Sequence, residues 1–182
     1  SIEYGYADDL RLGDQIGGWS EGDNVFLPKV GPEESREILL GLKQQSEEGR
    51  LVKDVESSGG SYSLDFRESA GYWLHALRDF PYSSSKINEV RFDSKVQRDV
   101  VELLFNSSLF YFYFVTYGNN RDVYKPYIQK FPFPPAKTID DNQDKITNLA
   151  DQLEDDLQSC FNPNVGRNGE FDNASIRDTI DA

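Results

Sequence analysis

Hydrophobic and polar residues alternate in the stretch that begins at Tyr62, and this spacing predicts a β-strand. Tyr62, Leu64 and Phe66 are separated by single polar residues, as expected for a strand with one buried face. Further strand candidates, each short and followed by turn-forming or charged residues, are 25–30, 51–55 and 89–92. The stretch 71–80 fits a strand or a helix, and 83–86 is expected to be a loop.

Four other stretches carry apolar residues at intervals of three and four, the spacing of one face of a helix. These stripes are Ile38, Leu39 and Leu42; Val96, Val100, Leu103 and Leu104; Leu109, Phe110, Tyr113 and Phe114; and Ile146, Leu149, Leu153 and Leu157. Pro32 suits the first turn of the first helix and Gly49 its end, while Ser94 can cap the second. Asp140 or Asp141 is expected to cap the last and longest helix.

The mixture of short strands and helices predicts an α+β fold, because few signatures of parallel crossovers are present. We expect a small mixed sheet with flanking helices and a long C-terminal helix. The chain divides into a glycine-containing connector at 1–24, a core at 25–137 and a C-terminal helical arm at 138–182, with one more helical turn expected at 174–180.

The composition excludes several classes of site. The 182 residues include one cysteine and one histidine, which excludes an internal disulfide, a multi-cysteine zinc site and a histidine metal cluster. No apolar run approaches the roughly 18 residues that cross a bilayer, so we expect a soluble protein with no membrane contact. The low cysteine count and the lack of a signal peptide are compatible with a cytoplasmic location. The chain contains no methionine, and we interpret it as a piece of a longer polypeptide.

The charge is unevenly distributed along the chain, whose net charge is −13. Residues 1–59 hold 6 basic and 13 acidic residues, giving −7, and residues 138–182 hold 3 and 11, giving −8. Residues 60–137 hold 10 and 8, giving +2, and contain most of the aromatic residues. A surface that faces DNA is therefore expected only in this middle segment.

A search for catalytic motifs finds little. Asp93-Ser94-Lys95, with Asp65 as a second carboxylate, matches part of a metal-dependent nuclease site, but Asp93-Ser94 is also an ordinary helix start. The glycine pairs at 17–18 and 59–60 lack the spacing of a phosphate-binding loop, and the turn at 162–164 lacks the aromatic that stacks on a flipped base.

The remaining reactive residues are expected to be structural. His75 has no recognisable partner for a catalytic triad, and we expect it in the core or at the surface. Cys160 is expected to be a buried thiol. The acidic run Asp151, Glu154, Asp155 and Asp156 faces away from the apolar stripe of the last helix, which predicts a solvated helix face.

One block of the middle segment is more distinctive than the rest. Residues 103–114 read LLFNSSLFYFYF, followed by NNRDV at 119–123 and IQKFPFP at 128–134. This block resembles the C-terminal recognition region of type II adenine-specific DNA methyltransferases of restriction–modification systems, including fused methyltransferase–endonucleases. Looser similarity covers roughly residues 25–181.

The resemblance implies a DNA target-recognition domain without catalytic residues of its own. The cofactor-binding glycine loop and the Pro-Pro catalytic loop of that family are absent from this chain. We therefore expect S-adenosylmethionine and methyl transfer in a covalently linked methyltransferase domain of the parent enzyme, and no cofactor in this chain.

The partner implied is double-stranded DNA. Asn106 and its neighbours, with the Phe-Pro-Phe-Pro strap, are interpreted as architectural, so DNA contacts are expected from the loops at 83–86 and 118–125. The candidate DNA-binding residues are Ser84, Ser85, Lys86, Asn119, Asn120, Arg121 and Lys125. Two alternatives stay open: an acidic protein-interaction module that does not contact DNA, and a metal-dependent nuclease fragment.

Overall fold

The computed structural model describes residues 19–21, 24–26, 33–69, 74–118, 121–164 and 170–171. Several sequence predictions lie outside these residues: the candidates Asn119 and Asn120, the end of the strand expected at 25–30, most of the connector, and the helical turn expected at 174–180. Helices and a small sheet together make an α+β fold with a long C-terminal helix, which confirms the predicted class.

A three-stranded antiparallel sheet forms the centre of the fold. Its strands, in spatial order, are β5 (Ala76–Leu77), β4 (Tyr62–Arg67) and β6 (Ile87–Phe92). The alternation predicted from sequence is present in β4, where Leu64 and Phe66 are almost fully buried. Leu64 pairs with Val90, so the buried faces of β4 and β6 coincide. All pairings among the described strands are antiparallel, whereas a mixed sheet was expected.

The first of two consecutive helices packs on the buried face of the sheet, and the second is bent by 65° relative to it. They are α2 (Lys95–Phe105) and α3 (Ser108–Tyr117). At the bend, the Asn106 amide bonds both backbone groups of Ala76: Oδ1 accepts the N–H at 3.1 Å, and Nδ2 donates to the carbonyl at 2.8 Å. Ser107 caps α3 by accepting the Phe110 N–H. The expected architectural role of this block is therefore confirmed.

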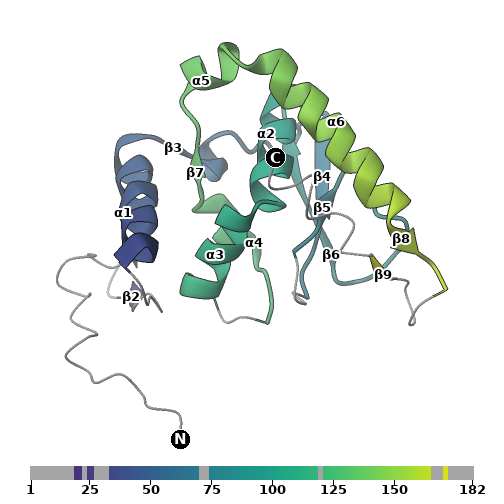
Figure 1. Ribbon diagram of the computed structural model, residues 1–182, viewed down its shortest axis with the longest axis horizontal. Helices are drawn as coiled ribbons and strands as arrows, with labels where there is room; N and C mark the ends of the chain where they lie inside the picture. Colours follow the sequence, from purple (N-terminus) through teal and green to yellow (C-terminus); the bar gives the residue numbers. More distant parts are fainter. Residues whose placement is uncertain are drawn as a thin grey trace, which may run out of the picture.

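A third layer packs beside these helices (Figure 1). It comprises α1 (Glu33–Glu48), β3 (Arg50–Leu51), the 3-10 turn η2 (Val52–Asp54), α4 (Lys125–Gln129), β7 (Pro132–Phe133) and α5 (Ala136–Asp140). The candidate strand at 51–55 is thus mostly a 3-10 turn. β3 pairs with β7, a two-residue strand consistent with the prolines of the strap. Two short pairs complete the structure: β1 (Trp19–Glu21) with β2 (Asn24–Phe26), and β8 (Phe161–Asn162) with β9 (Glu170–Phe171).

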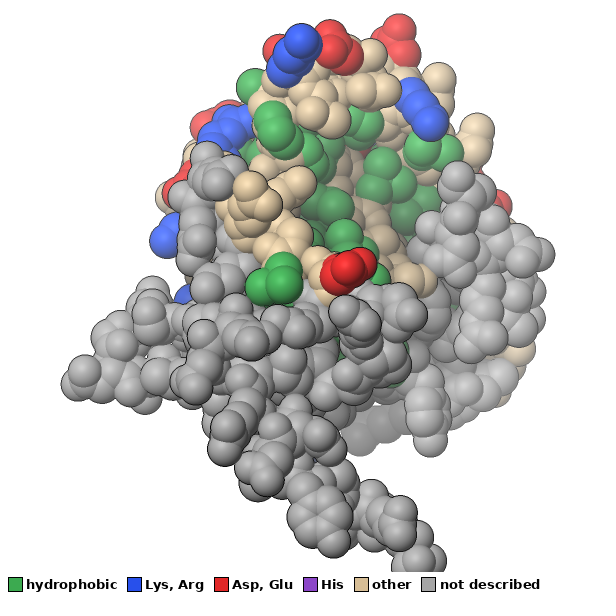
Figure 2. All heavy atoms as spheres, turned by 60° about the vertical axis from the view of Figure 1, so that its left-hand side comes forward, with side chains coloured by type: hydrophobic (Ala, Val, Ile, Leu, Met, Phe, Trp, Pro, Cys, Tyr) green, Lys and Arg blue, Asp and Glu red, His purple; other side chains and the backbone are tan. Residues whose placement is uncertain are grey.

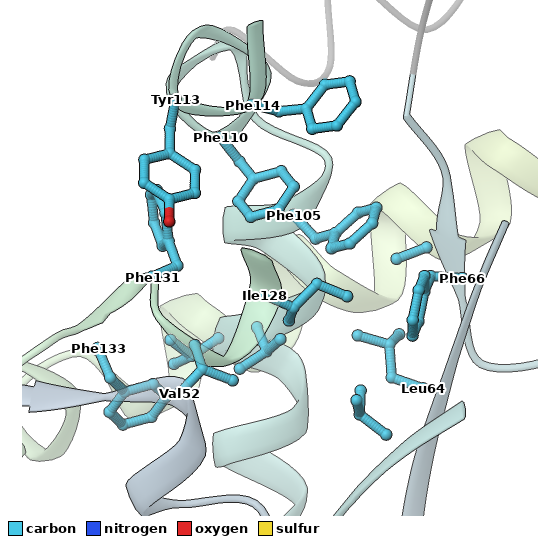
Figure 3. Close-up of a cluster of buried hydrophobic side chains, with 14 of the residues drawn as sticks. Val52, Leu64, Phe66, Phe105, Phe110, Tyr113, Phe114, Ile128, Phe131 and Phe133 are labelled. Carbon is cyan, nitrogen blue, oxygen red and sulfur yellow. The ribbon is translucent and has the colours of Figure 1, made fainter. Parts of the chain in front are cut away.

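The main core is strongly aromatic. Phe105 and Phe110 stack at 4.6 Å between ring centroids, and Phe131 of the strap meets Phe110 edge-on at 5.1 Å. Figure 3 shows these rings facing one another between the helices and the sheet, with Leu64 and Phe66 on the sheet side. The strap thus supplies core side chains, which explains why its aromatic residues are buried.

The long helix α6 (Gln143–Ser159) lies against α2 and closes a second, smaller core. Leu153 and Leu157 of α6 are buried with Leu77 and Phe80. The cap of α6 is Asn142 rather than Asp140 or Asp141, because residues 136–140 form a short helix of their own. Within the described residues, no single helix is both long enough and apolar enough to cross a membrane. The bent pair of α2 and α3 meets these two criteria only when the helices are counted together.

Candidate nucleic-acid interface

The two candidate loops meet at the end of β4. The Glu68 N–H donates to the Lys86 carbonyl at 2.7 Å, and the Glu68 carbonyl accepts the Val123 N–H at 2.6 Å. Ser69 forms a bridge with Asp122 beside them. Backbone hydrogen bonds thus bring residues 84–86 and 121–123, which are far apart in sequence, to opposite sides of Glu68.

The candidate side chains at this place are exposed, as expected. The side chain of Arg121 is 86% exposed and that of Lys86 is 54% exposed. Ser85 is exposed, and the half-buried Ser84 uses its hydroxyl to accept the Lys86 N–H at 3.2 Å. Each cation also has an acidic neighbour: Lys86 Nζ lies 3.2 Å from Glu68, and Arg121 Nε lies 3.5 Å from Asp122.

Lys125 does not join this group. Its ammonium pairs with Glu56, whose other oxygen accepts from Gln129 Nε2 at 2.8 Å. Glu56 forms a bridge with Phe92, which pairs with Tyr62 at the beginning of β4. Lys125 therefore points toward the opposite end of β4, and the structure does not bring it together with Lys86.

A pocket of about 480 Å³ opens beside the 83–86 loop on the polar face of the sheet. Asp65, Asp79 and Glu89 line it, together with Tyr82 and Ser84. Partial burial raises the pKa of Asp65, and the nearby charges of Glu89 and Asp79 raise it further, while Arg91 acts against them. The pocket is therefore negative, which favours a cation and disfavours a phosphate.

The two carboxylates of the nuclease alternative do not converge. Asp65 pairs with Glu89, and Asp93 follows four residues later along the same strand direction. Four residues of strand span roughly 13 Å, too far for one metal ion to bind both side chains. In the part of the chain that the structure describes, no group of three or more His, Cys, Asp or Glu residues could hold a metal.

Sequence reasoning missed a buried charge cluster between α2 and α6. Arg78, which follows β5, donates from Nε to Glu102 at 2.9 Å and from Nη1 to Asp151 at 2.5 Å. The Arg78 N–H also donates to Glu154 at 3.1 Å. The predicted solvated face is confirmed for Asp151 and Asp155, which are exposed, although Asp151 also pairs with Arg78. Glu154 and Asp156 are half-buried, so the prediction is wrong for them.

The cluster changes the pKa values of its members. Burial raises the pKa of Glu102 to about 8, and the negative charge of Glu154 adds to the rise, although Arg78 acts against it. Burial disfavours the charge of Arg78, yet its bonds to Asp151 and Glu102 raise its pKa above the ordinary value. The hydrogen bond from Arg78 lowers the pKa of Asp151. The only feature of the sequence that indicated this charge cluster was the position of Asp99 and Glu102 next to the apolar stripe of α2.

The lone histidine is packed in the interior, and the lone cysteine is partly exposed. His75 is buried, and its ring stacks on Phe171 with 4.5 Å between centroids, which confirms a packing role. Cys160 is half-buried rather than buried, because it lies at the end of α6 next to the exposed Ser159.

A different face of the molecule carries a hydrophobic hollow. Figure 2 shows apolar side chains gathered there, with charged side chains of both signs at the rim.

Comparisons were made with protein-family models, curated proteins and solved structures. None of them found a match.

Proposed function

We propose that this chain is the DNA target-recognition region of a type II adenine-specific DNA methyltransferase of the restriction–modification type. In this proposal it contacts double-stranded DNA, while a covalently linked domain binds S-adenosylmethionine and transfers the methyl group. The observation that carries the proposal is the meeting of the 84–86 and 121–123 segments at Glu68, with Lys86 and Arg121 exposed.

The separation of a buried scaffold from exposed loops within the chain supports this assignment. The block that resembles the methyltransferase family supplies the bend and the aromatic core, through Asn106, Phe110 and Phe131. Buried scaffold of this kind holds surface loops in fixed positions, as a protein needs when it reads base edges in a groove.

On binding DNA, Lys86 and Arg121 would exchange their carboxylate partners for phosphate groups. Exposed ion pairs such as Lys86–Glu68 contribute only about 0–1 kcal/mol, so a phosphate can displace the carboxylate at little cost. Because the chain has a net charge of −13, we expect weak affinity that falls steeply as salt is added.

The test is fluorescence anisotropy with labelled duplex DNA over a range of salt concentrations. The double variant Lys86→Glu/Arg121→Glu should bind at least about tenfold more weakly, with a salt slope reduced by about 2. Glu68→Gln should bind more tightly, because it releases Lys86 from its partner. The matched control is Lys137→Glu, an exposed charge reversal on α5, which should change affinity less than about twofold. Equal affinities for all four proteins would refute the proposal.

A second candidate is the acidic protein-interaction module, and the pocket lined by Asp65, Asp79 and Glu89 favours it. This candidate predicts binding of a lysine- and arginine-rich peptide that is weakened by Asp79→Asn and unaffected by Lys86→Glu. The DNA proposal predicts the opposite dependence for duplex DNA, so the two experiments separate the candidates.

A further inference from the structure

Tyr124 is an exposed aromatic residue in the loop at 118–125, where DNA contacts are expected. Among the described residues, three large apolar side chains are exposed: Ile38, Tyr62 and Tyr124. Tyr124 is 45% exposed. Single exposed apolar residues are common on protein surfaces, so the surroundings of Tyr124 decide what it can do.

Backbone hydrogen bonds fix the chain on both sides of Tyr124. On one side, the Val123 N–H donates to the Glu68 carbonyl at 2.6 Å. On the other, the Tyr124 carbonyl accepts the Tyr127 N–H at 2.9 Å at the beginning of α4. Pro126 in the first turn of α4 restricts the backbone further. The place of Tyr124 on the surface is therefore set by the fold.

A series of aromatic rings supports the Tyr124 side chain from the core outwards. Phe114 of α3 is 1% exposed and meets Tyr127 edge-on, with 5.8 Å between ring centroids. The half-buried Tyr127 stacks with Tyr124 at an angle of 26° and a centroid distance of 6.4 Å. The Tyr124 hydroxyl donates to Asp122 at 3.4 Å. A ring held in this way can bind a ligand without losing much side-chain entropy.

The charge around Tyr124 is opposite in sign to that of the whole chain. Residues 121–130 contain three basic residues and one acidic residue, whereas the chain has a net charge of −13. Two of the basic side chains flank Tyr124: Arg121 is 86% exposed and Lys125 is 43% exposed. Proteins bind nucleic-acid strands with this combination, in which a ring stacks on a base and cations pair with phosphates. The segment therefore favours a nucleic acid over an apolar protein surface.

Each of the two flanking cations also has a carboxylate partner. Arg121 Nε lies 3.5 Å from Asp122, and the Lys125 ammonium pairs with Glu56. Partly exposed ion pairs of this kind contribute little to stability, so phosphates can replace the carboxylates. Stacking of the uncharged Tyr124 ring on a base is not opposed by these carboxylates.

We propose that Tyr124 stacks on a nucleobase of the bound DNA, next to phosphates that pair with Arg121 and Lys125. This inference rests on the proposed DNA-binding function and adds a base contact to it. The bases of an intact duplex are stacked on both faces, so the ring needs a base with one open face, at an unpaired position or an opened base step. DNA that already offers such a base should therefore bind more tightly than fully paired DNA.

Fluorescence anisotropy with two labelled probes tests the proposal on the whole chain. One probe is a fully paired duplex, and the other is the same duplex with one unpaired adenine at its centre. The unaltered chain should prefer the second probe by at least about fivefold, the lower end of what stacking on one base contributes. Tyr124→Leu keeps an apolar side chain without a ring and should bind both probes equally, whereas Tyr124→Trp should retain the preference. The matched control is Ile38→Ala, which truncates a residue that is 46% exposed and should retain the preference too.

A 2-aminopurine at the unpaired position reports stacking directly when the protein is saturating. Its fluorescence should be quenched by the unaltered chain and by Tyr124→Trp, and less by Tyr124→Leu. Equal probe preference and equal quenching for the unaltered chain and Tyr124→Leu would overturn the inference. If Lys86→Glu/Arg121→Glu then still weakens duplex binding, the stacking contact alone fails; if the unaltered chain binds neither probe, the proposed function fails with it.

Discussion

Asn106→Asp should destabilise the fold strongly, although the two side chains have almost the same shape. The Asn106 amide donates to the carbonyls of Ala76 at 2.8 Å and of Glu102 at 2.9 Å, and it accepts the Ala76 N–H at 3.1 Å. Aspartate keeps the acceptor but loses both donors, and an ionised carboxylate then faces two carbonyl oxygens in a site that is 1% exposed.

The magnitude follows from the two lost bonds and from the charge that the substitution buries. Loss of its side-chain donor costs the Ala76 carbonyl about 1–3 kcal/mol, while the Glu102 carbonyl keeps the residue-106 N–H at 3.2 Å. The buried negative charge that faces both carbonyls adds a cost of at least similar size, so the free energy of unfolding should fall by about 3–6 kcal/mol near neutral pH. This is a large part of the roughly 5–15 kcal/mol that stabilises a typical domain.

Urea denaturation followed by circular dichroism measures the effect. Asn148→Asp, an exposed change of the same kind on α6, should alter the free energy of unfolding by less than about 0.5 kcal/mol. The difference between Asn106→Asp and the unaltered chain should shrink near pH 4, where a protonated aspartate regains one donor. A loss below about 1 kcal/mol at neutral pH would refute the role given to the Asn106 amide.

Three further changes test the packing around the site. Leu157→Ala, at a fully buried position of α6, should lower the free energy of unfolding by about 2–5 kcal/mol in urea denaturation, and a smaller loss would contradict the packing of α6. Arg78→Met should lower it by about 3–5 kcal/mol, because Glu102 loses its cation; thermal melting that matches the unaltered chain would argue against the cluster. Gly60→Ala should cost about 1–3 kcal/mol, since its Cβ would lie 2.3 Å from the Phe92 carbonyl oxygen, and an unchanged denaturation midpoint would show that the turn can shift.

Features that depend on neighbours in sequence were predictable. The alternation at Tyr62, Leu64 and Phe66 and the helical stripes located β4, α1, α2, α3 and α6, because burial on one face leaves a local period in the sequence. The short helix α5 was missed because its five residues carry too little periodicity, and the cap of α6 was misplaced for the same reason.

Features that depend on distant pairing were not predictable. The bonds that Asp151 and Glu154 form with Arg78 could not be predicted, because Arg78 lies more than seventy positions away along the chain. Exposure of Lys86 and Arg121 was predictable from their loops, but their approach on either side of Glu68 required the backbone bonds at the end of β4.

The central claim is that this chain recognises DNA by sequence, and selection from a pool of randomised duplexes tests it most directly. The chain is incubated with the pool at low salt, and the bound molecules are sequenced after several rounds. The account predicts enrichment of one short motif, which Lys86→Glu/Arg121→Glu fails to recover. A bound pool with the same base composition at every position as the input would contradict it.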